Sequence, residues 1–349
     1  MKTYIIAEAG VNHNGRLNLA YNLVNTAKKI KANCVKFQLF KHNYLTTKFA
    51  PQASYQKKNT KKKQTQFELL KRLELNTNNL IKIQKYCEQK KIDFLLSVFG
   101  IEELKIIKKL KLKTVKLPSG EINNLPLLKG IARSNLNLIL STGMANMKEI
   151  TFTLNYLKKN GLKKNKISIL QCTTDYPTKL NDVNLRAMKT LQQKFKVKVG
   201  LSDHTIENES SISAVAMGAT IIEKHLTLNN HMSGPDHKAS LNPKKFKELI
   251  NSIRKVEILL GSGKKLPSKA ELKIKKIVRK SIVAKLPIKK GEIFTDINIT
   301  CKRPEGGISA SNWEKVVGKK STKNFSPDEF IKLWKKFVLF QALEQILDY

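Results

Sequence analysis

The sequence has 349 residues, of which 41% are hydrophobic, enough to bury the core of one large domain and a smaller second one. Its formal net charge of +39 first suggests a nucleic-acid or anionic-membrane partner. Only seven of the 66 basic residues are Arg and the lysines are spread over the whole chain, whereas base readout and bidentate phosphate contacts favour Arg, so we expect no nucleic-acid partner.

The four cysteines lie far apart and form no Cys-x-x-Cys pair, so neither a disulfide framework nor a thiolate zinc site is indicated. The first residues do not have the character of a signal peptide, and no apolar run approaches the roughly 18 residues that a membrane span needs. We therefore expect a cytoplasmic protein with no membrane partner.

Short runs of β-branched and apolar residues recur along the chain, each followed by a stretch with helical spacing. Leu19, Leu23 and Ala27, for example, recur at intervals of four, which places them on one face of a helix. Strand then helix, repeated eight times, predicts an α/β protein with a (β/α)₈ TIM barrel. The predicted strands are 4–8, 34–38, 94–98, 114–117, 138–141, 168–172, 197–201 and 220–224.

The second and third predicted strands are separated by a long stretch whose first part, 41–66, is polar and rich in Lys. In a barrel this insertion lies on the carboxyl-terminal face, where insertions act as lids or subunit contacts. The barrel is assigned to 1–260, and Gly, Ser and Pro in 261–280 indicate a linker. Short strands punctuated by Gly and Pro predict a compact β-rich domain over 281–331. The tail, 332–349, is apolar with helical spacing, and no function follows from it.

Charged and polar side chains collect at the carboxyl ends of the predicted strands, where TIM barrels carry their active sites. Residues two apart in a strand share a face, so Lys36 and Gln38 point the same way, as do Glu223 and His225. The candidate residues at these ends are Glu8, Lys36, Gln38, Lys116, Ser119, Glu121, Ser141, Tyr176, Ser202, His204, Glu223 and His225.

Two histidines, His204 and His225, fall on neighbouring predicted strands. Such strands lie about 4.8 Å apart, so both imidazoles can share one divalent ion and leave positions open for water and substrate. A single His inside a barrel more often has a structural role, with its ring hydrogen-bonded, than a metal-binding one. Lys, Glu and His together, however, are rarely tolerated unpaired in a barrel interior. Two lysines that converge with Ser119, Ser141 and Ser202 predict a pocket for a small polyanion carrying phosphate.

The same residues lie in motifs that closely resemble those of sialic acid synthases and their relatives that make legionaminic acid. The small domain, with Lys302-Arg303-Pro304 and Gly307-Ile308-Ser309, looks like the family's antifreeze-like (SAF) domain. The barrel motifs are Ile5-Ile-Ala-Glu-Ala-Gly-Val-Asn-His-Asn-Gly15, Val35-Lys-Phe-Gln38, Leu117-Pro-Ser-Gly-Glu121, Leu140-Ser-Thr-Gly-Met144, Cys172-Thr-Thr-Asp-Tyr-Pro177, Gly200-Leu-Ser-Asp-His-Thr205, Glu223-Lys-His225 and Ser233-Gly-Pro-Asp-His237.

This resemblance implies an enzyme that condenses phosphoenolpyruvate with an N-acylated amino sugar. It implies a divalent ion on His204 and His225, of the manganese type, with magnesium and cobalt as alternatives. Phosphoenolpyruvate would be held by Lys36, Lys116, Ser119, Ser141 and Ser202, the acids would be Glu8, Glu121 and Glu223, and Gln38, Tyr176 and Asp236 would meet the sugar. It also implies a domain-swapped homodimer, in which Arg303 reaches the sugar's N-acyl group in the other subunit's site.

The identity of the sugar stays open at this point. We expect N-acetylmannosamine, giving N-acetylneuraminate, with 2,4-diacetamido-2,4,6-trideoxymannose, giving N,N'-diacetyllegionaminate, as the alternative. Thr174 stands where some members of the family carry Asn. The sequence Thr173-Thr174-Asp175-Tyr176-Pro177 is more similar to the legionaminate-type or alternative sialate branch of the family. After strand three the family commonly has Ser-Thr-Pro-Phe-Asp, whereas this chain has Ser97-Val98-Phe99-Gly100, which lacks that hydroxyl and carboxylate.

Two more distant alternatives belong to other functional classes. A metal-dependent barrel hydrolase also uses His and carboxylates at strand ends. Two histidines without a third imidazole, however, provide few ligands for a hydrolytic metal site. A polyanion-binding module would use the basic surface and the small domain, and it would show a steep salt dependence without turnover.

Overall fold

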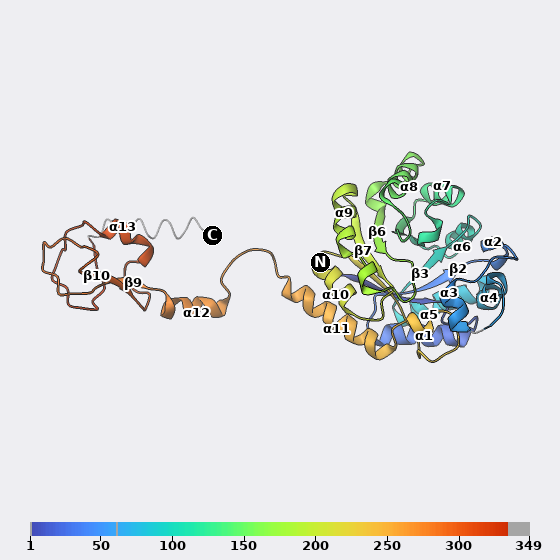
Figure 1. Ribbon diagram of the computed structural model, residues 1–349, viewed down its shortest axis with the longest axis horizontal. Helices are drawn as coiled ribbons and strands as arrows, with labels where there is room; N and C mark the ends of the chain where they lie inside the picture. Colours follow the sequence, from blue (N-terminus) through green and yellow to red (C-terminus); the bar gives the residue numbers. More distant parts are fainter. Residues whose placement is uncertain (1, 61, 334–349) are drawn as a thin grey trace. The chain divides into compact units, whose positions relative to one another are not determined.

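The computed structural model describes residues 2–60 and 62–333, and the chain divides into two compact units with the boundary between Ser262 and Gly263. The first unit is a closed barrel of parallel strands that neighbour one another in sequence order, with helices around it (Figure 1). This confirms the predicted (β/α)₈ fold. The strands are β1 (Tyr4–Gly10), β2 (Cys34–Leu39), β3 (Asp93–Val98), β4 (Thr114–Leu117), β5 (Asn137–Ser141), β6 (Ile167–Cys172), β7 (Lys198–Asp203) and β8 (Ile221–His225).

Four of the barrel helices begin after a residue whose side chain accepts a hydrogen bond from a free backbone N–H group. Asn146 forms a capping box with Glu149 at the start of α8, and Asn242 caps α11, whose first residue is Pro243. Several of these helices bury an apolar stripe, as α1 does with Leu23 and Ala27. The barrel helices are α1 (Leu17–Lys29), α5 (Thr77–Lys90), α6 (Glu103–Lys109), α7 (Leu125–Arg133), α8 (Met147–Lys159), α9 (Leu185–Phe195), α10 (Glu209–Ala216) and α11 (Pro243–Leu259).

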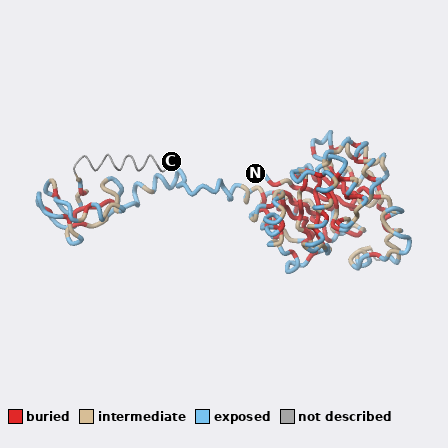
Figure 2. The backbone as a smooth tube through the Cα atoms, turned by 90° about the horizontal axis from the view of Figure 1, so that it is seen from above, coloured by how far each residue is buried: buried red, intermediate tan, exposed pale blue. Residues whose placement is uncertain are grey.

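The interior of the barrel changes from apolar to polar along the strands. Near the amino ends, Ile6, Leu95 and Ile139 belong to one small apolar cluster inside the strands. Side chains alternate in a strand, so the next inward residue of β1 is Glu8 and that of β5 is Ser141. The barrel contains most of the chain's buried residues (Figure 2). Apolar side chains therefore fill the barrel interior near the amino ends of the strands, and charged side chains form a layer near the carboxyl ends, where a site was predicted.

The insertion after β2 folds into three helices, α2 (His42–Leu45), α3 (Ser54–Thr60) and α4 (Gln66–Leu73), the last of which precedes α5. A capping box between Thr65 and Glu68 starts α4. Leu69 and Leu73 of α4 pack with Val11, which follows β1, and with Phe40, which follows β2, in a separate apolar cluster. The insertion is thus anchored at the carboxyl end of the barrel.

The second unit is built around a two-stranded antiparallel sheet of β9 (Ser281–Ala284) and β10 (Ile299–Lys302), followed by the short helix α13 (Trp313–Val316). Ile282, Phe294 and Phe325 are among its core residues. The segment predicted as a linker contains a helix, α12 (Lys269–Val278), which has no buried residue.

Two sequence expectations concern long apolar segments. Within the described part of the chain, no helix combines the length and apolar character that crossing a membrane requires. The tail predicted to be helical, 332–349, lies outside the described residues from 334 onward.

Candidate active site

A cavity of about 160 Å³ opens at the carboxyl ends of the barrel strands, and all eight strands contribute to its wall. The lining combines lysines, glutamates and histidines with small hydroxyl side chains. These residues are Glu8, Lys36, Gln38, Ser97, Phe99, Lys116, Pro118, Ser119, Gly120, Ser141, Cys172, Thr174, Tyr176, Ser202, His204, Glu223 and His225. The structure thus gathers in one place residues that were predicted from strand ends far apart in the sequence.

A larger cavity of about 650 Å³ opens at the opposite, amino-terminal mouth of the barrel. Its lining includes Lys2, Lys113 and Lys198, but it contains no histidine or glutamate, and Asp93 is its only acid. Lysine is common everywhere in this chain, so these side chains mark no particular site. The smaller cavity, where acids, lysines and histidines converge, is the candidate active site.

Three of the predicted residues do not line this cavity. Glu121 lies in the turn after β4, where its Oε2 accepts a hydrogen bond from Asn124 Nδ2 at 2.7 Å. Asp236 is buried in the segment after β8. Arg303 belongs to the second unit, so its predicted role, like the predicted homodimer, stays a prediction.

The floor of the cavity is a buried network of two lysines and two glutamates. Lys36 Nζ lies 2.9 Å from Glu8 Oε2 and donates a hydrogen bond to Ser97 Oγ at 2.7 Å. Lys116 Nζ donates to Glu223 Oε1 at 2.8 Å. These four charged side chains formally cancel. An anion that entered the cavity would therefore meet two ammonium groups already fixed in position.

The glutamates of this network differ in their electrostatic surroundings. Burial opposes the charge of Glu223, but Lys116 and Lys36 outweigh burial and lower its pKa to about 2. For Glu8 burial dominates, and together with the charge of Glu223 it raises the pKa against the opposing effect of Lys36. Glu223 is therefore a permanent counter-ion for the lysines.

The two histidines are placed to bind a metal ion between them. Their ring centroids lie 5.5 Å apart. His204 Nδ1 lies 2.7 Å from the Thr173 carbonyl oxygen, a partner that only an N–H can serve, so Nε2 is the nitrogen left for a metal. Against the effect of burial, Cys172 and this hydrogen bond raise the pKa of His204, so a metal on Nε2 would displace a proton. His225 Nδ1 is buried without a hydrogen-bond partner in the described part of the protein. Burial also holds the pKa of His225 well below its usual range, and a neutral imidazole is the form that binds metals.

The donor set fits an ion held by few protein ligands. Among the described residues there is no group of three His, Cys, Asp or Glu side chains arranged for a metal ion. Cys172 Sγ approaches His204 Nδ1 only to 3.9 Å, and that nitrogen is already hydrogen-bonded to Thr173. Two imidazoles would leave most coordination positions to water and substrate, as an open catalytic site requires.

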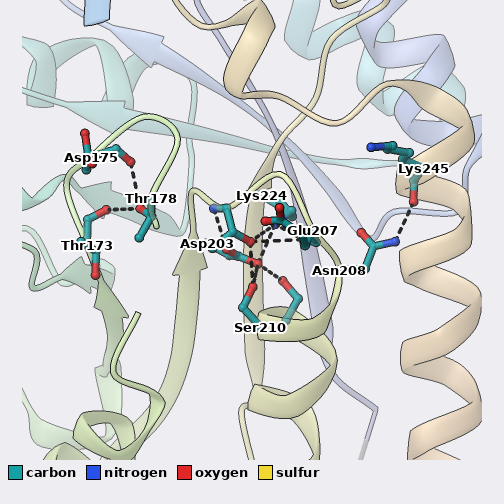
Figure 3. Close-up of polar contacts among 11 residues, drawn as sticks. Thr173, Asp175, Thr178, Asp203, Glu207, Asn208, Ser210, Lys224 and Lys245 are labelled. Carbon is teal, nitrogen blue, oxygen red and sulfur yellow. Dashed lines mark hydrogen bonds and ion pairs between the residues drawn. The ribbon is translucent and has the colours of Figure 1, made fainter. Parts of the chain in front are cut away.

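Behind the histidines, a buried ion pair joins β7 to β8 (Figure 3). Lys224 Nζ lies 2.7 Å from Asp203 Oδ2, and the strand register sets these two residues opposite each other. The same oxygen accepts hydrogen bonds from Ser210 and Ser211 in α10, at 2.6 and 2.5 Å. Side chains alternate along an extended chain. Fixing Asp203 and Lys224 on the outer side therefore fixes the residues that follow them, the predicted metal ligands His204 and His225, on the inner side.

Lys224→Met should destabilise the barrel by about 3–5 kcal/mol, since it leaves the Asp203 carboxylate buried without its cation. Lys105→Met is the matched control. It removes an exposed pair with Glu102, which should change the free energy of unfolding by about 0–1 kcal/mol. Urea unfolding of both variants measures the difference. A Lys224→Met protein as stable as the wild type would show that the pair does not hold the strands.

Asp236 should make stability depend on pH in an unusual direction. Burial, reinforced by the charge of Glu8, raises its pKa from 3.8 to about 7. The folded protein then binds this proton more tightly than the unfolded chain, so the stabilisation is complete below the unfolded pKa and is lost as pH rises through 7. Between pH 5 and pH 8 the wild type should lose about 2–3 kcal/mol relative to Asp236→Asn. Urea unfolding with a chelator present tests this, and parallel profiles would contradict it.

The loop after β3 departs from the family pattern, yet a carboxylate lies beside it. Glu103 is only 2% exposed, and a Cβ atom on Gly100 would lie 2.6 Å from its Oε2. Burial raises the pKa of Glu103. The absence of a side chain at position 100 therefore leaves room for a carboxylate supplied by α6, three residues later.

Several site features escaped the reasoning from sequence. Ser97 and Phe99 line the cavity, and Ser97 binds Lys36, but neither was given a role. The Asp203 and Lys224 pair was quoted only as part of two motifs. The sequence did contain a signal for this pair. On each of two neighbouring strands, a charged residue stands between two residues that were predicted to face inward.

Comparisons with known proteins agree on the family. Residues 23–265 match the NeuB family and residues 279–335 the SAF domain. The chain is 50% identical over 332 residues to N,N'-diacetyllegionaminic acid synthase of Campylobacter jejuni, covering 95% of this chain and 99% of that protein. It is 41% identical to the Legionella pneumophila protein of the same name, covering 93% and 92%.

A solved structure extends this likeness to the fold. The N-acetylneuraminic acid (sialic acid) synthetase of Leptospira borgpetersenii matches with a TM-score of 0.70 and 32% identity, over 78% of this chain and 90% of that one. The two family matches cover the barrel from within α1 onward and the small unit. The chain therefore belongs to the sialic acid synthase (NeuB) family and is an enzyme whose barrel is followed by a SAF domain.

Proposed function

We propose that this enzyme is an N,N'-diacetyllegionaminate synthase, which joins phosphoenolpyruvate to 2,4-diacetamido-2,4,6-trideoxymannose. The support comes from the relatives at 50% and 41% identity, both named for diacetyllegionaminic acid. Thr174 on the cavity wall agrees with this choice. N-acetylneuraminate synthesis from N-acetylmannosamine, which the sequence analysis placed first, becomes the alternative.

The observation that carries the phosphoenolpyruvate part of the proposal is the presence of two buried ammonium groups in one cavity. Lys36 and Lys116 are each 2% exposed. Phosphoenolpyruvate carries a phosphate and a carboxylate, and buried cations with free donors bind such groups strongly. Ser141 Oγ is buried without a hydrogen-bond partner among the described residues, and Ser119 Oγ accepts from the Gly143 N–H. We assign these four side chains, with Ser202, to the phosphoenolpyruvate site.

A divalent ion on His204 and His225 completes the proposed site, with manganese expected and magnesium or cobalt as alternatives. When bound, the ion supplies Lewis-acid polarisation of the sugar's carbonyl oxygen. His204 and His225 lie at the top of the charged layer, on the same cavity wall as Tyr176. A sugar bound there would present its carbonyl carbon to phosphoenolpyruvate held by the lysines.

The reaction forms a carbon–carbon bond and a carbon–oxygen bond to water, and it breaks the carbon–oxygen bond that holds the phosphate. C3 of phosphoenolpyruvate bonds to the aldehyde carbon of the open-chain sugar, and C2 gains positive charge. Water adds at C2 and phosphate leaves as C2 becomes a carbonyl, with one proton of the water going to the former aldehyde oxygen and the other to the phosphate. A carboxylate near C2 stabilises that charge. Glu8 lines the cavity whereas Glu121 does not. Among the described residues Glu8 is paired with Lys36 alone, whereas Glu223 is held by Lys116, Lys36 and Ser202. We therefore assign the charge-stabilising role to Glu8.

Phosphate release and product mass test this function together. We expect phosphate only when both phosphoenolpyruvate and a sugar are present, with the diacetamido trideoxy sugar used faster than N-acetylmannosamine. Phosphate release from phosphoenolpyruvate alone would favour a hydrolase. A product of N-acetylneuraminate mass, formed at the higher rate, would reverse the choice of sugar while leaving the reaction type intact.

A further inference from the structure

The insertion after β2 places an aromatic ring against the wall of the candidate site. Tyr55 of α3 lies with its ring centroid 5.0 Å from that of Tyr176, at an interplanar angle of 31°. The Tyr176 ring lies 4.1 Å from the ring of His204. Three rings from three separate segments therefore form a continuous stack, and its inner two members line the cavity.

A second contact ties α3 to the other side of the site. Asn59 Nδ2 donates a hydrogen bond to the Pro235 carbonyl oxygen at 2.6 Å. Pro235 precedes Asp236, and the Asp236 charge, after burial, contributes to raising the pKa of the Tyr55 hydroxyl, so that hydroxyl lies near the carboxylate. The helix thus connects the segment after β6, which carries Tyr176, to the segment after β8, which carries Asp236.

These two contacts attach α3 to the site. The helix has no buried residue, so it has no apolar core of its own. An aromatic pair contributes about 0.5–1.5 kcal/mol beyond the area it buries. Loss of the Tyr55 ring would therefore release Tyr176 from one side while leaving the barrel core and the lysine network unchanged.

We propose that Tyr55 is a positioning residue that sets the sugar specificity of the enzyme by holding Tyr176 against the acceptor. This inference rests on the proposed function. In the diacetamido trideoxy sugar C6 is a methyl group and C4 carries an acetamido group, whereas N-acetylmannosamine carries a hydroxyl at each of these carbons. A fixed aromatic wall favours the apolar groups, and one methyl-sized difference in a well-packed pocket is worth about 10–200-fold in kcat/KM.

Tyr55→Ala and Tyr55→Phe test the role of the ring, with Tyr44→Ala as control, since Tyr44 lies in the same insertion but is 70% exposed. We expect Tyr55→Ala to raise the sugar KM about 10-fold and to lower the preference for the trideoxy sugar by a similar factor, because one aromatic contact is lost. The KM for phosphoenolpyruvate should stay unchanged. Tyr55→Phe and Tyr44→Ala should behave as the wild type. Tyr55→Leu replaces Tyr55→Ala if the latter does not fold.

An unchanged sugar KM and an unchanged preference in Tyr55→Ala or Tyr55→Leu would overturn the proposal. Equal rises in the KM of both substrates would also overturn it, because general damage to the barrel would explain them. If the wild type uses N-acetylmannosamine alone, the proposed sugar is wrong. Tyr55 is then judged by the KM for that sugar against the KM for phosphoenolpyruvate, so the two failures are distinguishable.

Discussion

Lys116→Met should lower kcat/KM by about 10³-fold, since one preorganised charged donor in a water-excluded site contributes about 10²–10³ and this lysine also balances a buried carboxylate. Lys116 is 2% exposed and holds Glu223 at 2.8 Å. Methionine keeps the length of the side chain but removes the charge and the donors. Steady-state kinetics with both substrates varied provides the measurement.

The Lys116 variant needs a control for folding, because it leaves Glu223 buried without its nearest cation. The double variant Lys116→Met/Glu223→Gln removes both charges and should recover much of the stability without recovering activity. A Lys116→Met enzyme with wild-type kcat/KM would remove this lysine from the proposed phosphoenolpyruvate site.

His204→Ala should abolish manganese binding and with it turnover, a loss of at least about 100-fold in metal affinity, since even the hydrogen-bond partners of metal ligands contribute about 10–100-fold. His204 is one of two imidazoles facing the cavity, so its removal leaves His225 alone. Electron paramagnetic resonance of free Mn²⁺ gives the dissociation constant directly. Excess EDTA should likewise stop the wild-type reaction, and added manganese should restore it.

His231→Ala is the matched control, because His231 is an exposed histidine in the segment after β8 and does not line the cavity. It should bind manganese as the wild type does. Full activity of the wild type in excess EDTA, or unchanged manganese affinity of His204→Ala, would contradict the assignment of a metal to these histidines.

The alternation of residues in strands is what made the barrel site predictable. Lys36 and Gln38, and likewise Glu223 and His225, were expected to share a face, and all four line one cavity. The prediction needed only that strands end at the same rim. It depended little on exact boundaries, since β7 and β8 end one or two residues later than predicted.

Features that depend on packing between distant segments could not be predicted in this way. Nothing in the sequence near Tyr55 indicates that its ring stacks on Tyr176, 121 positions later. Glu103 beside Gly100 is a similar case, since only the folded loop shows that the carboxylate fills the space of the absent side chain. The sequence motif also could not show where the Glu121 side chain points, because a local hydrogen bond from Asn124 determines its direction.

The choice of sugar depends on individual side chains around the cavity and not on the fold. N-acetylmannosamine and the trideoxy sugar share the carbonyl end that would meet the proposed metal and phosphoenolpyruvate, so the charged layer alone does not separate them. They differ at C4 and C6. Discrimination must come from the upper wall, where Thr174 and Tyr176 lie, and the sequence motifs constrain that wall less than the charged floor.

The central claim is that one cavity holds both the metal between the histidines and the phosphate donor on the lysines. Anomalous diffraction at the manganese edge, from crystals grown with Mn²⁺ and phosphoenolpyruvate, tests it in one measurement. We predict a manganese peak bonded to His204 and His225, with phosphoenolpyruvate oxygens within hydrogen-bond distance of Lys36 and Lys116. A manganese peak elsewhere, or phosphoenolpyruvate bound away from both lysines, would contradict it.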